Sequence, residues 1–571
     1  MKKTVSRVLS VLLLVCMLLT LGATSAFAAD ESSEQSPDIL TEVLKAMDTA
    51  YVGKNVKLYI KPDKSAGLPS KVKVTFHYND LNGAVYLPGT ASDQKFYYSW
   101  NDPDLVLTRN GKTYKSGKAP VAKVGKSITY QATKGGETAA IRIKTVRGSS
   151  EVDAMFVTVD EKKGTIKAMN EDPDHETSCY GKVLYDGKSR YISMKGRGNS
   201  TWVFPKKPYN LTFYDDATYD SKDGVKLIDG VKAKKWSLVA NHLDASLLRN
   251  KIAMDLADDL GIGLKTKFVD LWVNGRYYGN YLLTPKNDYD TPDGGYQLEN
   301  DNYIEPGESF QLPGMFEIGS LPGVTVLGSG YNNRICLKEM GDTAAAGGEN
   351  LQTIEKYFDK AWAAVLDYDS EDYQKYFDIE SWSKMYLMYE VAKLYDCYAG
   401  SLLMHRDGLT KKDKLIAGPA WDYDISLGRT LHKFFVGISE PMQLNAEGWY
   451  LDHIGVDLSD QPISLLQELG KHKSFRDQVA KTYNEYEWAF NDLPRNVTRQ
   501  QDLLRDSALM NNERWLTNNL NAEYVVAPNT MSALGTGKYK LRYHVTTTWD
   551  DYCYNLKEYC TKRVLWLSDH T

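Results

Sequence analysis

The sequence predicts an α+β protein in which a small all-β sandwich domain precedes a larger domain, β-rich in its first part and mainly helical in its second. Residues 51–148 contain short segments that alternate apolar and polar residues between Asn, Asp, Gly and Pro signals. Similar segments continue over residues 149–345, whereas apolar residues recur at helical spacing over 346–571. With 571 residues, 42% of them hydrophobic, the chain is long enough to bury more than one core.

The first 28 residues have the pattern of a secretory signal peptide. Basic residues at positions 2, 3 and 7 precede an apolar run that ends in Ala26-Phe27-Ala28, the small-residue pattern of a cleavage site. A retained membrane anchor is the alternative, but the run is short for one. No later stretch is long and apolar enough to span a bilayer, so we expect a secreted or cell-surface protein. Residues 29–50 are polar and then weakly helical, which predicts a linker.

The overall charge gives no general argument for nucleic-acid binding, because the chain has a net charge of −5 and a pI near 6.1. The five cysteines after the predicted signal peptide are odd in number and not closely paired, so neither a disulfide framework nor a zinc site is expected. A single disulfide among these five cysteines is still compatible with the sequence. Cys553 and Cys560 would lie about two turns apart on one helix, too far to bridge, and are expected in the core.

Residues 51–148 predict the β-sandwich. Segments such as KVKVTFHY, LVLTRNGKTY and AAIRIKTV alternate apolar and polar residues, and Asn82-Gly83 and Asn110-Gly111 are turn signals between such segments. No pattern here indicates catalysis. We expect an accessory module, for which a structural role, a polysaccharide ligand and a protein ligand are all open.

A glycine-rich basic loop, KGRGNSTWVFPKKPYNLTF at 195–213, is the first stretch that indicates chemistry. Glycines on both sides of Arg197 let backbone amides approach an anion, and the guanidinium offers a fixed fork for phosphate. Lys206 and Lys207 then lead into a predicted strand. This order is that of a nucleotide-phosphate clamp; the alternative is a basic hairpin on the surface.

A helix is predicted within residues 236–262, because apolar residues recur there every four positions and a glycine ends the pattern. Asp244 is the expected N-cap. Arg249 and Asn250 lie off the apolar stripe, either on the surface or as polar partners of the glycine-rich loop. Strands are expected on both sides of Asn274-Gly275, a strong hairpin signal, and again at 294–301 and 333–340.

The second part of the larger domain contains a pair of acidic residues between apolar flanks. Predicted helices at 349–366 and 381–394 are followed by a short strand, a charged turn and then LIAGPAWDYDISLG at 415–428. In an extended segment, Asp422 and Asp424 would point to one face and favour Mg²⁺ or Ca²⁺. Such pairs also occur on solvated loops, but unpaired charge is costly among apolar neighbours.

Several ordered motifs together are far more specific than any one of them. They are KGRGNSTW and PKKPYNL at 195–211, LVANHLD and LLRNK at 238–251, VNGRYYGNY at 273–281, GGYQLE at 294–299 and WDYD with its following Gly at 421–428. From about residue 149 to its end, the chain resembles the CotH family of spore-coat and secreted atypical kinases. The resemblance implies a divergent bilobal protein-kinase-like fold, with an N-lobe at about 149–345 and a C-lobe at about 346–571. It also implies ATP with Mg or Mn as cofactors and phosphorylation of Ser or Thr on a secreted, spore-coat or surface protein.

The resemblance, carried over residue by residue, assigns catalytic and metal-binding roles in the second part. Asp396 takes the place of the catalytic-loop Asp that orients or deprotonates the acceptor hydroxyl. Asp422 is where the metal-binding Asp is expected, and Asp424 is a second ligand or a hydrogen-bond acceptor beside it. Leu394-Tyr395-Asp396 replaces the kinase H-R-D triplet, and no catalytic-loop Asn follows, which leaves the second metal ligand open.

On the phosphate side, the resemblance makes Lys207 the lysine that contacts the α- and β-phosphates, with Lys206 as the alternative register. Arg197 would line the phosphates, and Glu299 would pair with the lysine. Two alternatives to an active kinase remain. One is a pseudokinase scaffold that assembles partners through the β-sandwich; the other is a calcium-stabilised surface protein that binds polysaccharide.

Overall fold

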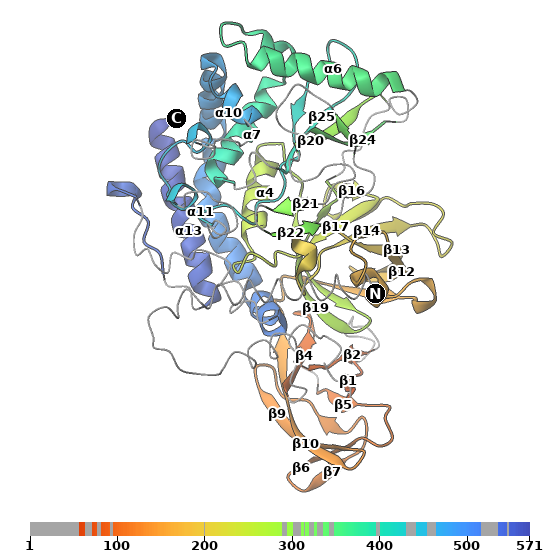
Figure 1. Ribbon diagram of the computed structural model, residues 1–571. Coiled ribbons are helices and arrows are strands. Elements are labelled where there is room, and N and C mark those ends of the chain that lie inside the picture. The colour runs from red at the N-terminus through yellow and green to blue at the C-terminus, as the bar shows by residue number, and fades with distance from the viewer. Residues whose placement is uncertain are drawn as a thin grey trace, which may run out of the picture.

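The computed structural model describes residues 56–62, 71–76, 82–91, 95–198, 200–287, 294–300, 310–312, 315–318, 325–327, 335–341, 348–394, 400–429, 441–453, 464–515, 535–544 and 548–571. The predicted signal peptide, the predicted linker and Asp396 lie outside these residues. A β-sandwich lies at one end of the molecule, a β-barrel lies in the middle, and long C-terminal helices run along one side (Figure 1).

The β-sandwich consists of two sheets packed on a shared core. One sheet has four strands in the order β2 (Val72–Lys73), β1 (Tyr59–Ile60), β5 (Tyr97–Ser99) and β8 (Ala119–Pro120). The other has six in the order β3 (Thr75–Phe76), β4 (Asn82–Leu87), β10 (Glu137–Arg147), β9 (Ser127–Lys134), β6 (Val106–Arg109) and β7 (Lys112–Tyr114). Alternation along β9, with Ile128, Tyr130 and Ala132 buried, places one side of this strand in the core.

Of the two turn signals predicted in this domain, one is confirmed and the other is wrong. Asn110-Gly111 connects β6 to β7, and both residues have positive φ as a tight hairpin requires. Asn82-Gly83 instead begins β4, where the two residues pair with β10. Gly83 is needed there for space, because a Cβ would lie 2.9 Å from the Phe76 ring on the neighbouring strand.

A closed seven-stranded barrel follows the sandwich. Its order is β11 (Asp153–Val159), β12 (Ser178–Tyr185), β13 (Lys188–Gly196), β14 (Tyr209–Tyr214), β17 (Lys235–Val239), β19 (Arg276–Pro285) and β18 (Lys267–Val273), and parallel pairing of β11 with β18 closes it. Asn274-Gly275 forms the predicted hairpin between β18 and β19. Phe156, Trp272 and Tyr277 of the barrel belong to the sandwich core, so the two β structures are joined by continuous apolar packing.

Helix α4 (Arg249–Asp259) is shorter than predicted and does not use Asp244 as its N-cap. The Asp244 carboxylate accepts hydrogen bonds from the backbone N–H groups of Ser246 and Arg249, at 3.0 and 2.8 Å. These bonds hold the preceding residues in a polar turn, so the helix begins only at Arg249.

A five-stranded sheet and long helices complete the fold. The sheet order is β23 (Thr325–Leu327), β24 (Ile335–Met340), β20 (Tyr296–Asn300), β25 (Leu402–Arg406) and β26 (Ile416–Ala417), so its hydrogen bonds join strands from both sides of residue 345. The main helices are α6 (Gly348–Val365), α7 (Ile379–Ala392), α11 (Lys473–Trp515) and α13 (Trp549–His570). Short elements are η3 (Glu161–Lys163), α3 (Ile166–Asn170), η4 (Ser200–Val203), β15 (Val225–Ile228), β16 (Val231–Ala233), β21 (Phe310–Leu312), β22 (Met315–Ile318), η5 (Asp372–Lys375), α9 (Pro441–Leu444), η6 (Leu451–His453), α10 (Leu465–Leu469) and η8 (Gly537–Tyr539).

The α+β class is confirmed. Within the described residues, no helix has both the length and the apolar character needed to cross a membrane. The described cysteines Cys179, Cys336, Cys553 and Cys560 are buried thiols outside any disulfide bond, which confirms the expected core positions of the last two.

Candidate functional site

Three segments that are far apart in the sequence meet around the paired aspartates. Arg197 follows β13, Glu299 lies on β20, and Asp422 belongs to the loop after β26. The Arg197 guanidinium carbon lies 5.3 Å from the centre of the Trp421 ring in this loop. Burial lowers the pKa of Arg197, while Asp422 and Asp424 raise it, so both predicted metal ligands lie within electrostatic range of the predicted phosphate-binding arginine.

The segment that carries the paired aspartates is a loop, so the expectation of an extended strand is wrong. Asp422 has a φ of 64°, in the left-handed region. Alternation along a strand therefore does not decide where the two carboxylates point. The loop is held from outside instead: Tyr423 donates its backbone N–H to Asn250 Oδ1 at 2.7 Å, and Arg249 Nε donates to the Ser426 carbonyl at 3.0 Å.

A buried ion pair holds Arg249 in the position from which it contacts the loop that carries the paired aspartates. Arg249 Nη1 lies 2.6 Å from Asp244 Oδ1, and their side chains are 6% and 0% exposed. Although burial opposes it, Arg249 together with Arg429 holds the pKa of Asp244 below its usual value. Arg249 and Asn250 thus contact the paired-Asp loop rather than the glycine-rich loop considered from the sequence. The first residues of α4 reach that loop because they lie in the core and not on the surface.

The carboxylates of Asp422 and Glu299 lie close enough to repel. Burial raises the pKa of Asp422, Arg197 lowers it, and Glu299 raises it again. Glu299 and Asp424 are each 8% exposed. Within the described part of the chain, however, no three His, Cys, Asp or Glu side chains are grouped to hold a metal ion.

Glu299 pairs with Lys338 of β24, not with Lys207 as expected. The Lys338 Nζ lies 2.5 Å from Glu299 Oε2, across the neighbouring strands β20 and β24. The sequence analysis missed Lys338. A charged residue inside the predicted strand NRICLKEM at 333–340 was the only available signal, and strand order was needed to see its partner.

Both predicted phosphate lysines are bound to backbone carbonyls. Lys206 is fully buried and donates to the carbonyls of Ala240 and Asn280 at 2.6 and 2.5 Å; burial lowers its pKa to about 7. Lys207 donates to the carbonyls of Trp202 and Phe204, and burial lowers its pKa to about 8. These hydrogen bonds engage both lysines within the protein, and Glu299 forms its ion pair with Lys338 instead.

Two further buried side chains, Arg429 and His242, have polar atoms without a partner among the described residues. Arg429 Nη1 donates to the Asp424 carbonyl at 3.1 Å, but its Nε and Nη2 have no hydrogen-bond partner within the described part of the chain. Nδ1 of the buried His242 also has no partner among the described residues, and burial, followed by the charges of Lys206 and Arg429, lowers the pKa of this histidine to about 3. Unsatisfied buried donors are costly, so Arg429 has capacity to bind an acceptor.

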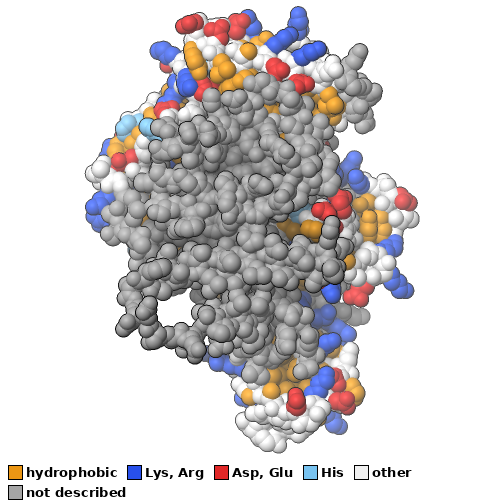
Figure 2. All heavy atoms as spheres, in the orientation of Figure 1, with side chains coloured by type: hydrophobic (Ala, Val, Ile, Leu, Met, Phe, Trp, Pro, Cys, Tyr) orange, Lys and Arg blue, Asp and Glu red, His pale blue; other side chains and the backbone are white. Residues whose placement is uncertain are grey.

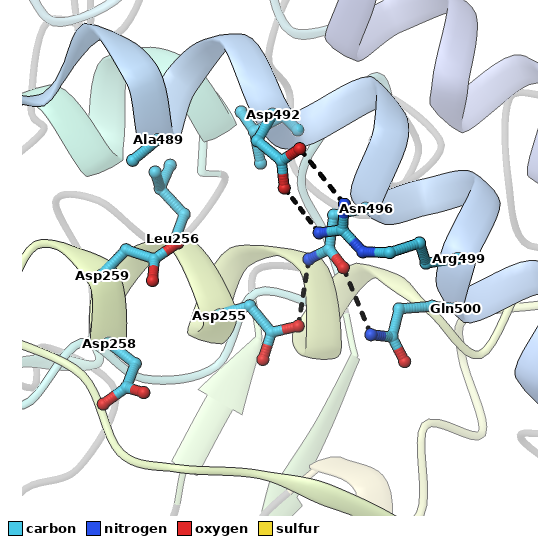
Figure 3. A pocket seen from close by; sticks show the side chains of 10 residues that line it. Asp255, Leu256, Asp258, Asp259, Ala489, Asp492, Asn496, Arg499 and Gln500 are labelled. Carbon is cyan, nitrogen blue, oxygen red and sulfur yellow. Dashed lines mark hydrogen bonds and ion pairs between the residues drawn. The ribbon is translucent and has the colours of Figure 1, made fainter. Parts of the chain in front are cut away.

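A hollow between α4 and α11 lies apart from these residues and contains none of the predicted site residues (Figure 3). Asp255, Asp258, Asp259 and Asp492 line it together with Arg499. Asn496 donates to Asp255 at 3.0 Å, and Arg499 donates to Asp492 at 3.1 Å, so part of its acidic charge is already compensated. It offers no nucleophile or general base beyond ordinary carboxylates.

Comparison with known proteins supports the resemblance found in the sequence. A family model described as CotH kinase protein matches residues 194–567. Inner spore coat protein H of Bacillus subtilis (strain 168) is 24% identical over 250 residues, which are 42% of this chain and 60% of that protein. The match thus spans less than two thirds of the relative. Because the family model covers more than half of the chain and includes every residue of the site described above, the chain belongs to the CotH family.

Proposed function

We propose that this chain is an exported atypical protein kinase that transfers the γ-phosphoryl group of ATP to Ser or Thr of a secreted, spore-coat or surface protein. The observation that carries the proposal is the convergence of Arg197, the Asp422–Asp424 pair and the Glu299–Lys338 ion pair within a CotH-family domain. The relative is named as a spore coat protein, which favours a surface location.

A hard divalent cation fits the acidic side of the site. Asp422 and Glu299 repel each other where water is partly excluded, and a cation would remove that cost. Mg²⁺ is commonly held by one or two carboxylates and completes its shell with water and substrate phosphates. Asp422 and Asp424 would hold Mg or Mn, which would neutralise charge on the phosphates of bound ATP.

The basic side fits phosphate. In protein kinases, a strand lysine held by a glutamate contacts the phosphates, and Lys338 with Glu299 has this arrangement. Lys338 therefore replaces Lys207 and Lys206 in the proposal. Arg197 provides a second cation, and Arg429, whose Nε and Nη2 have no partner among the described residues, provides two more donors. Phosphoryl transfer needs this kind of positioned charge compensation rather than a protein nucleophile.

The remaining role is at the acceptor. The substrate hydroxyl oxygen would form a bond to the γ-phosphorus as the bond to the β–γ bridging oxygen breaks, and its proton would pass to Asp396, a role taken from the CotH resemblance. A kinase-like bilobal arrangement of residues 149–571, with the sandwich at 51–148 as an accessory module, is part of the same proposal.

Transfer of labelled γ-phosphate from ATP with Mg²⁺ or Mn²⁺ tests the proposal. Wild type should label itself or a Ser/Thr acceptor, and Asp396→Ala and Asp422→Asn should abolish labelling. Asp477→Asn, an exposed carboxylate on α11, is the control and should label normally. Nucleotide binding without transfer would favour a scaffold. If the protein neither binds nucleotide nor transfers phosphate, the kinase proposal is wrong.

A further inference from the structure

The β-sandwich is strongly basic although the whole chain is acidic. Residues 51–148 contain 17 Lys and Arg against 6 Asp and Glu, a net charge of +11, whereas the whole chain has a net charge of −5. Blue Lys and Arg side chains lie around the sandwich at the bottom of the view in Figure 2. This segregation of charge favours an anionic partner for this domain.

Part of the positive charge is concentrated on the outer face of the four-stranded sheet. Leu58 and Ile60 are buried, so alternation turns Lys57, Tyr59 and Lys61 outward. The register, in which Tyr59 pairs with Lys73 and Ile60 with Val72, sets Lys61 opposite Lys71. The ammonium groups of Lys61 and Lys71 lie 5.8 and 4.8 Å from the centre of the Tyr59 ring.

The barrel adds a fifth cation to this cluster. Lys73 donates its backbone N–H to the carbonyl of Gly275 at 2.8 Å, so the tip of the β18–β19 hairpin is docked on β2. The next residue is Arg276. Burial lowers the pKa of Lys73, and Arg276, Lys71 and Lys57 lower it further, with Glu161 opposing them. Lys57, Lys61, Lys71, Lys73 and Arg276 therefore form one cluster, called here the lysine face.

Within the part of the chain that the structure describes, only Glu161 acts against the positive charge at Lys73 of the lysine face. Among the described residues, none of its five cations forms an ion pair; the sandwich lysines that do so, Lys134 with Asp102 and Lys144 with Glu513, lie elsewhere. Like charges opposite each other on neighbouring strands are unfavourable. The five cations nevertheless lie together, four on the sandwich and one on the barrel, and an anionic ligand would reduce the repulsion between them.

We propose that the lysine face binds an acidic polypeptide segment of a partner protein. Carboxylates on alternate residues of an extended segment repeat at about 7 Å, the spacing expected between Lys71 and Lys73 on β2. Four of the five cations are lysines, which bind carboxylates as point charges without the planar fork that favours base edges. Tyr59 is only 9% exposed beneath two ammonium groups, so its ring is closed to stacking by a base or a sugar.

Direct binding to the full chain without ATP tests this inference separately from the proposed kinase activity. The probe is a fluorescent peptide of alternating Glu and Ser, with an alternating Gln and Ser peptide as its control. Neutralising the face with Lys57→Gln, Lys61→Gln, Lys71→Gln and Lys73→Gln should weaken binding at least about tenfold. Binding should also weaken as salt rises from about 0.05 to about 0.5 M.

A matched variant separates the lysine face from diffuse charge. Lys115→Gln, Lys118→Gln, Lys123→Gln and Lys126→Gln removes the same charge from exposed turns of the same domain and should change affinity less than about threefold. Equal losses in both variants would overturn the inference. Tighter binding of polygalacturonate or oligothymidylate than of the peptide would overturn it in favour of a polysaccharide or nucleic acid. Binding that appears only after the six acids at 30–48 are changed to amides would assign the face to that segment instead.

Discussion

Replacing Asp244 by Asn should strongly destabilise the protein because it leaves a buried guanidinium without its counter-charge. The Asp244 side chain is 0% exposed and lies 2.6 Å from Arg249 Nη1. Its carboxylate also accepts from Ser246 Oγ at 2.7 Å and from the Arg249 backbone N–H at 2.8 Å. Since Arg249 holds the paired-Asp loop through the Ser426 carbonyl, the damage should reach the proposed catalytic site.

The distance and burial set the expected size of the effect. At 2.6 Å and an effective dielectric constant of about 20, two unit charges attract by roughly 6 kcal/mol. Asn retains an acceptor but no charge, and removal of one partner from a buried pair costs about 3–5 kcal/mol. The double variant Asp244→Asn/Arg249→Met should recover part of this loss, because no buried charge is left unpaired.

Urea denaturation of matched variants measures the loss. Lys473 and Asp477 on α11 form an ion pair at the same 2.6 Å, but their side chains are 88% and 65% exposed. Asp477→Asn should therefore cost less than about 0.5 kcal/mol. If Asp244→Asn costs less than about 1 kcal/mol, or no more than Asp477→Asn, the argument from burial is wrong.

Other predictions concern the buried Asp270, the proposed phosphate lysine Lys338 and the buried cysteines. Burial raises the pKa of Asp270 to about 6, above the unfolded value of about 3.9, so ionisation of this carboxyl opposes folding. From about pH 3 to about pH 7, wild type should lose about 3 kcal/mol of stability that Asp270→Asn does not lose, as measured by urea unfolding at each pH. Lys338→Met should weaken ATP binding at least about tenfold in calorimetry and Lys207→Met less than about threefold, whereas the reverse order would restore Lys207 as the phosphate lysine. Burial raises the pKa of Cys560 to about 12, and the four described cysteines should react with a thiol-specific disulfide reagent only after unfolding; labelling of the native protein would contradict their burial.

Most secondary structure was predictable because its signals are local. The Asn274-Gly275 turn lies between the expected strands, and apolar spacing predicted α6 and α7 close to their observed bounds. The errors occurred where a distant contact outweighs a local preference. Asn82-Gly83 enters β4 because β10 pairs with it. Helix α4 starts late because Asp244 accepts hydrogen bonds from the backbone N–H of Ser246, ahead of the helix, and of Arg249, its first residue.

For the candidate site, the sequence by itself determined the family and pointed to Arg197, Glu299 and the Asp422–Asp424 pair, but not to Lys338 or Arg429. The order of the glycine-rich loop, the LLRNK segment and the WDYD motif sufficed for that, since motifs are read along the chain. Only the tertiary structure decided which charged side chains form ion pairs with each other. Lys338 reaches Glu299 because β24 and β20 are neighbours in one sheet, and Lys207 does not, because carbonyls of its own loop bind its ammonium. Partner choice depends on distances between segments that sequence spacing does not contain.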